Sequence, residues 1–166
     1  MTLKLKPISP NAVPVALQKV ERYRLLNEPW EAQSICEDIL SVDPGNESAL
    51  VQLVLAMTDQ MGDGVSESEA RQAVARLGNE YNRAYYAGIV SERSAKATLR
   101  QGHPGCQLIA ADSLHDAMEW FEKAEALRPE GNDDAILRWN TCARMIMRYP
   151  ALEPRPTEKY EEVLGE

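Results

Sequence analysis

Aromatic residues are scarce in this chain, which has one Phe, three Trp and six Tyr among its 166 residues. It also lacks any run in which Val, Ile, Thr or Tyr alternates with polar residues. Because sheets are built from β-branched and aromatic residues at period two, we expect no substantial β-sheet. Ala, Leu, Glu, Gln and Arg dominate instead, and this composition is typical of helices. The sequence therefore predicts an all-α protein.

Long apolar runs and an excess of positive charge are also missing. No window approaches the roughly 18 apolar residues of a membrane span, so we expect no membrane insertion. Two lysines near the N-terminus have no apolar stretch behind them, which disfavours a secretory signal. The formal net charge of −8 disfavours a nucleic-acid partner, because phosphate binding needs clustered Lys and Arg. Three widely spaced cysteines without a CxxC pair indicate reduced thiols and a cytoplasmic location.

Motifs of catalysis and metal binding are absent as well. The chain contains no GxSxG, no glycine-rich phosphate loop and no paired Cys–His motif, so we predict no catalytic residue and no cofactor. His103, Cys106 and His115 are the nearest approach to a metal site. A structural zinc site needs four ligands at close spacing, and Asp112 or Asp116 would have to complete this set. We predict no metal site.

Apolar residues recur every three or four positions along most of the chain, which predicts amphipathic helices separated by turns rich in Pro, Gly and Asn. Ser66 and Glu69 have the spacing of a capping box at one helix start. Residues 78–111 include an irregular stretch and a loop around His103 and Cys106 for which the sequence suggests no role. The seven predicted helices cover residues 13–26, 30–41, 47–61, 67–77, 80–100, 112–127 and 133–148.

Three regions follow from this pattern. Residues 1–11 are predicted to form an extended arm, 12–149 a helical domain and 150–166 a tail rich in Pro and Glu. Within the tail, residues 157–164 have a capping Thr and helical apolar spacing. We consider two alternatives for them, a short helix that covers the last helix of the domain, and a frayed end that leaves the exposed face of that helix to a partner or a second copy.

Two of the predicted helices share one internal pattern. Each copy begins with a small residue, and a residue able to fill a hole between helices follows four positions later. Another apolar residue follows three positions after that, and a Pro in the closing turn comes five positions later still. A third, degenerate copy keeps the first two spacings through Ala70, Val74 and Leu77. The two full copies are Ala32, Cys36, Ile39 and Pro44, and Ala117, Phe121, Ala124 and Pro129.

The segments EAQSICEDILSVDPGN and DAMEWFEKAEALRPEGN, which carry these copies, resemble helix B and the closing turn of the tetratricopeptide-repeat family. This resemblance implies a right-handed helical solenoid of about seven antiparallel helices. Residues 78–111 depart from the repeat length of the family. An ordinary antiparallel helical bundle, which also uses Ala and Leu at helical spacing, is the alternative.

The resemblance further implies a concave groove, lined by the first helix of each repeat, that holds a peptide or helix of a partner protein. We therefore predict a protein-binding adaptor or chaperone-like module. The alternatives are a chaperone of a secreted protein and a self-associating scaffold, that is, a homo-oligomer. For Arg138 there is a competing interpretation, in which it only forms a surface ion pair with Asp134 on the same helix. The predicted groove residues are Gln18, Glu21, Arg24, Gln52, Leu55, Leu137, Arg138, Thr141 and Arg144.

Overall fold

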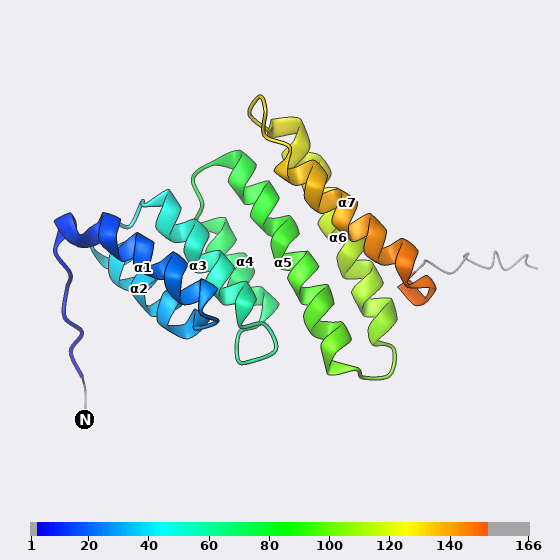
Figure 1. Ribbon diagram of the computed structural model, residues 1–166, viewed down its shortest axis with the longest axis horizontal. Coiled ribbons are helices and arrows are strands. Elements are labelled where there is room, and N and C mark those ends of the chain that lie inside the picture. The colour runs from blue at the N-terminus through cyan, green and yellow to red at the C-terminus, as the bar shows by residue number, and fades with distance from the viewer. Residues whose placement is uncertain (1–2, 153–166) are drawn as a thin grey trace, which may run out of the picture.

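The computed structural model describes residues 3–152, and within that range the chain is all-α (Figure 1). Seven α-helices pack antiparallel in chain order, each against the next, and two short 3-10 turns flank them. The prediction of an all-helical protein is confirmed, while the relation to a repeat family stays a prediction. The helices are α1 (Val13–Leu25), α2 (Pro29–Val42), α3 (Glu47–Asp59), α4 (Glu67–Ala75), α5 (Glu80–Gln101), α6 (Cys106–Leu127) and α7 (Asp134–Arg148), with η1 (Pro10–Ala12) and η2 (Pro150–Leu152).

Local chemistry explains where most helices begin and end. The predicted capping box at α4 is present, because Glu69 N donates to Ser66 Oγ at 3.3 Å and Ser66 N donates to Glu69 Oε2 at 2.8 Å. Asn46 and Asn79 cap α3 and α5 by accepting backbone N–H groups through their side-chain oxygens. Asn27 has a φ of 60°, a conformation that Asn tolerates, and it reverses the chain between α1 and α2.

The largest difference from the sequence prediction lies at α6. This helix was expected to begin at residue 112 or 113, but it begins at Cys106. Gly102 and Gly105 both have positive φ, so they close α5 and start α6 within one tight turn. The stretch predicted as irregular is therefore mostly helix. As a result α5 and α6, each 22 residues long, form the most extensive helix pair of the described chain.

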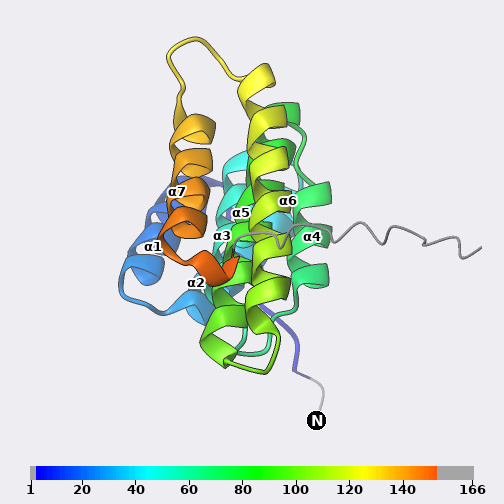
Figure 2. The same cartoon turned by 90° about the vertical axis from the view of Figure 1, so that its right-hand side faces the viewer.

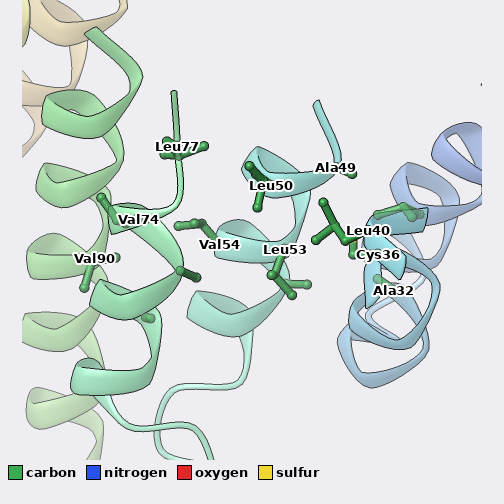
Figure 3. Close-up of a cluster of buried hydrophobic side chains, with 14 of the residues drawn as sticks. Ala32, Cys36, Leu40, Ala49, Leu50, Leu53, Val54, Val74, Leu77 and Val90 are labelled. Atoms are coloured by element: carbon green, nitrogen blue, oxygen red, sulfur yellow. The ribbon is translucent and has the colours of Figure 1, made fainter. Parts of the chain in front are cut away.

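Two hydrophobic clusters form the interior. Most of the first joins α1 to α4, and Figure 3 shows its side chains from α2, α3 and α4 pointing into a common interior. The second joins α5, α6, α7 and η2. Each cluster contains the three helical residues of one full copy of the shared pattern. These residues, Ala32, Cys36, Ile39, Ala117, Phe121 and Ala124, are all fully buried.

Alternate helices face different sides of the molecule. Figure 2 shows α1 and α7 on one side and α4 and α6 on the other. Helix α3 contacts both α1 and α5 in addition to its chain neighbours. The odd-numbered helices α1, α3 and α5 therefore form one continuous layer.

The ends of the domain differ from the predicted boundaries. Residues 3–9 carry no helix, as expected of an arm, but Ile8 packs against the first cluster and η1 begins at Pro10. The tail was expected from residue 150, yet η2 packs against α6 and α7 and buries Leu152. The expected capping segment 157–164 lies outside the described residues.

Candidate functional site

A cleft of about 1140 Å³ opens on the odd-numbered helices. Helices α1, α3 and α5, the C-terminal end of α7 and η2 supply most of its walls, and α4 supplies none. Pro29 and Gln107 are the only contributions of α2 and α6. The remaining lining residues are Glu21, Arg24, Leu25, Asn27, Gln52, Thr58, Asp59, Arg93, Lys96, Leu99, Arg100, Met145, Tyr149, Ala151 and Leu152.

The charge of the cleft is opposite to that of the protein. Its lining has four cations, one on α1 and three on α5, against the carboxylates of Glu21 and Asp59. The whole chain has a formal net charge of −8. The cleft can therefore attract an anionic group although the protein is acidic, because local potentials follow the local charge distribution rather than the net charge.

An ionic network fixes one end of the cleft. Asp59 at the end of α3 accepts Arg24 Nε at 2.8 Å and Arg93 Nη1 at 3.1 Å, so one carboxylate ties α1 to α5. Arg24 Nη1 also donates to Gln52 Oε1 at 3.3 Å. Arg93 Nε is buried and has no hydrogen-bond partner among residues 3–152. The network orients both guanidinium groups before any ligand is bound.

A basic stripe runs along α5 toward the other end. Arg93, Lys96 and Arg100 are spaced i, i+3 and i+7, which places them on one face of the helix. Arg100 Nη2 donates to the backbone oxygen of Met61 at 3.4 Å, and within the described part of the chain no carboxylate lies within 4.0 Å of its guanidinium. Arg100 is thus the cation of the stripe with the most capacity left for a ligand.

Apolar side chains complete the lining. Leu25 of α1 is 88% exposed, and Tyr149 after α7 is 51% exposed. Leu99 lies between the cations of α5, and Met145 faces the cleft from α7. The cleft therefore combines a cationic stripe with scattered apolar contacts, a combination suited to a peptide that carries both acidic and apolar residues.

Beneath the stripe lies a buried ionic cluster. Glu92 of α5 is fully buried. Its carboxylate forms ion pairs with the ammonium of Lys96 and with Arg138 Nε of α7, the latter at 3.2 Å. The sequence predicts Arg138 as a groove residue. In the structure Arg138 takes part in the fold, because its ion pair neutralises a carboxylate whose charge burial would otherwise strongly destabilise. The competing surface pair with Asp134 is not among the ion pairs of the described residues.

Of the nine groove residues predicted from sequence, Glu21, Arg24 and Gln52 line the cleft. Gln18 is exposed beside it on α1, and Leu55 packs against the second hydrophobic cluster. The α7 residues Leu137, Arg138, Thr141 and Arg144 do not line it.

The rotation of α7 about its axis explains that last result. Ile136, Trp139, Ala143 and Ile146 recur at helical spacing in the sequence, which predicts an apolar stripe. The residues that α7 buries are instead Ala135, Cys142 and Ile146. The helix is therefore turned relative to the prediction, and Met145 rather than Arg144 reaches the cleft. Burial by neighbouring helices decided this rotation.

The cationic residues of α5 are the functional candidates that sequence reasoning missed. They fall in the stretch 78–111, to which the sequence suggested no role. The i, i+3, i+7 spacing of Arg93, Lys96 and Arg100 was the available signal, since it predicts a basic stripe on any helix. What the spacing does not show is which face of α5 remains open.

The cysteines lie in the interior. Burial raises the pKa of Cys36 and of Cys142 to about 12, so both stay protonated thiols at neutral pH and neither has the character of a nucleophile. Cys106 is also buried. Across residues 3–152, no group of three His, Cys, Asp or Glu side chains is arranged to hold a metal ion. His103, Cys106 and His115 do not form such a group.

No family model matches the chain, and neither a curated protein nor a solved structure is significantly similar to it. Helices that combine the length and the apolar character needed to cross a membrane are not found between residues 3 and 152.

Proposed function

We propose that this protein is a binding module that holds an acidic segment of a partner protein in the cleft on its odd-numbered helices. The observation that carries the proposal is the basic stripe of Arg93, Lys96 and Arg100 in the wall of a large cleft, on a chain that is otherwise acidic. An adaptor and a chaperone of a secreted protein would use such a cleft in the same way.

The size of the cleft supports a peptide as the ligand. Its volume of about 1140 Å³ exceeds the roughly 300–1,000 Å³ of typical small-molecule pockets. Its lining comes mostly from the alternate helices α1, α3 and α5, and helical-repeat proteins likewise present an extended concave surface to a peptide. The resemblance of α2 and α6 to helix B of the tetratricopeptide repeat is consistent with this arrangement.

The preset geometry of the cations supports recognition of carboxylates. Asp59 and Gln52 hold Arg24, and Asp59 also holds Arg93, so less side-chain freedom is lost when a ligand binds. Arginine offers planar pairs of N–H donors that match a carboxylate. Acidic residues of the ligand would supply specificity and a fast association rate, while Leu25 and Leu99 would contribute apolar contact.

Selection from a random displayed-peptide library tests the proposal. The full-length protein is compared with two charge reversals of exposed arginines, Arg100→Glu inside the cleft and Arg144→Glu outside it. We expect the wild type and Arg144→Glu to enrich acidic peptides with interspersed apolar residues, and Arg100→Glu to lose them. Thermal unfolding of all three proteins checks that each variant folds.

Two results would contradict the proposal. One is a library from which the wild type enriches nothing. The other is equal enrichment by all three proteins, which would place the binding surface outside the cleft. A loss with Arg144→Glu alone would return the site to the α7 face that the sequence pattern first suggested.

Self-association is a second candidate function, and one specific observation favours it. Leu25, Leu26 and Trp30 are 88%, 61% and 67% exposed, and all three lie around the turn between α1 and α2. Exposed apolar residues grouped in this way mark interaction surfaces. Sedimentation of the wild type and of Trp30→Ser distinguishes the cases, because a homo-oligomer formed through this turn would dissociate in the variant.

A further inference from the structure

We infer that residues 153–166 of this same chain bind in the cleft and compete with an outside partner. The inference deepens the proposed function and rests on the same site. The segment itself lies outside the described residues. The inference rests on the sequence of the segment, on the position of Leu152 at the cleft and on the charge of the cleft.

The segment starts at the wall of the cleft. Leu152 lines the cleft and is fully buried, and its N–H donates to the oxygen of Tyr149 at 2.8 Å. Tyr149 and Ala151 also contribute to the lining. Residue 153 is therefore covalently attached to a residue that already sits at the edge of the site.

The charge of the segment complements the cleft. Residues 153–166 contain five Glu against one Arg and one Lys. Glu158, Glu161 and Glu162 are separated by three and one positions, so all three can face a basic stripe from one turn of helix, and Glu158 and Glu162 can do so from an extended chain. Three apolar residues, Tyr160, Val163 and Leu164, lie in the same stretch as the glutamates. This composition matches the acidic and apolar ligand for which the cleft is suited.

The attachment makes a weak contact effective. Glu158 is six residues beyond Leu152, a reach of up to about 20 Å for an extended chain. The stripe from Arg93 to Arg100 is about 10 Å long at the helical rise per residue. A segment tethered at such a distance has an effective concentration on the order of millimolar, so an affinity too weak for a free peptide would still fill the cleft.

Occupancy by the chain's own segment would set a threshold for partners. If the segment fills the cleft in about nine of ten molecules, the apparent affinity for an outside peptide falls about tenfold. A partner would then need a longer or more acidic segment than the protein itself supplies.

Zero-length carbodiimide crosslinking of the full-length protein tests the inference, because this reagent joins a lysine amine to a carboxylate in direct contact. Lys96 is the only lysine among the lining residues, while Lys19 of α1 and Lys123 of α6 are exposed outside the cleft and serve as internal controls. An equal mixture of unlabelled and heavy-isotope-labelled protein shows whether each link lies within one chain. We expect links within one chain from Lys96 to Glu158 or Glu161.

The same links should weaken in raised salt, which screens the contact, and in Arg100→Glu, but not in Arg144→Glu. Arg100→Gln is a milder second variant if the charge reversal unfolds the protein. Tail links that are as frequent at Lys19 and Lys123 as at Lys96 would overturn the inference. Links found only between light and heavy chains would also overturn the inference, and they would show that the tail of a second copy occupies the cleft.

A titration gives an independent readout. The probe is a fluorescent synthetic peptide with the sequence of residues 153–166, added to the wild type and to the variant in which Glu158, Glu161 and Glu162 are replaced by Lys. We expect the variant to bind the probe with a dissociation constant about tenfold lower, because its own segment no longer competes. Equal affinities would overturn the inference. A peptide library that enriches nothing, together with tail links at Lys96, would instead count against the proposed outside partner alone.

Discussion

The two copies of the shared pattern lie in two halves of the molecule that pack in different ways. In α2 the position that fills the space between helices holds Cys36, and in α6 it holds Phe121. Both side chains are fully buried. The first copy belongs to a stack of helices of at most 14 residues, and the second to the long pair of α5 and α6.

The difference shows that the same sequence pattern can pack against two different kinds of neighbouring helix. Opposite Phe121, α5 carries Gly88, and a Cβ atom added there would lie 2.5 Å from Phe121 Cε1. The ring therefore occupies space that only a glycine leaves open. The second half also contains Glu92, the only buried charged residue of the described chain. The second half is thus specified by tight fit and buried charge, and the first mainly by apolar burial of smaller residues.

The comparison is tested most strongly by truncating the two equivalent positions. Phe121→Ala should lower the free energy of unfolding by about 3–5 kcal/mol, because it removes a large buried ring and leaves a cavity. Cys36→Ala removes only one buried sulfur atom and should cost about 1 kcal/mol, the value of a single small buried group. Urea unfolding of both variants measures the difference. Equal losses would mean that the two halves pack alike.

The fit of Phe121 to α5 is tested by Gly88→Ala, which we expect to destabilise the protein by about 1–3 kcal/mol through overpacking. In a helix without this neighbour the same change would stabilise by about 1 kcal/mol, so the sign of the effect is informative. Gly45→Ala, in the turn between α2 and α3, controls for space alone, since a Cβ atom there meets nothing within 4 Å. If Phe121→Leu is added, the penalty of Gly88→Ala should shrink. Two penalties that simply add would show that the ring does not cause the effect.

The buried charge of the second half gives the smallest expected effect. Arg138→Ala should cost about 1–2 kcal/mol, because Glu92 loses one of its two cationic partners while Lys96 remains. Arg144→Ala, on the exposed side of the same helix, should stay within about 0.5 kcal/mol. Thermal unfolding of the two variants in one buffer decides the matter. Similar melting temperatures would mean that the Arg138 ion pair contributes nothing to the fold.

How far the sequence predicted the site depends on the helix concerned. On α1 and α3, the predicted groove residues Glu21, Arg24 and Gln52 line the cleft. On α7 the apolar stripe was misjudged by a fraction of a turn, since Ala135 and Cys142 are small and weakly hydrophobic, yet fully buried. That error moved Arg144 into the predicted groove and left out Met145.

The start of α6 shows a second kind of error. The sequence pattern predicts a loop at Gly102 and Gly105 and an irregular stretch after it. In the molecule the two glycines form a tight turn, and Cys106 already belongs to the next helix. Such a turn is short only because α5 and α6 pack along their whole length, and that contact lies outside the reach of local patterns.

The sequence by itself determined the helical class, the capping box of Ser66 and Glu69, and which residues of the shared pattern are buried. These features depend on interactions between residues a few positions apart, and such interactions leave a periodic trace in the chain. Only the tertiary structure decided the rotation of α7, the pairing of Arg138 with Glu92, and the open face of α5 that carries Arg93, Lys96 and Arg100. Those outcomes depend on which helices are neighbours, and the packing of the whole chain determines which helices are neighbours.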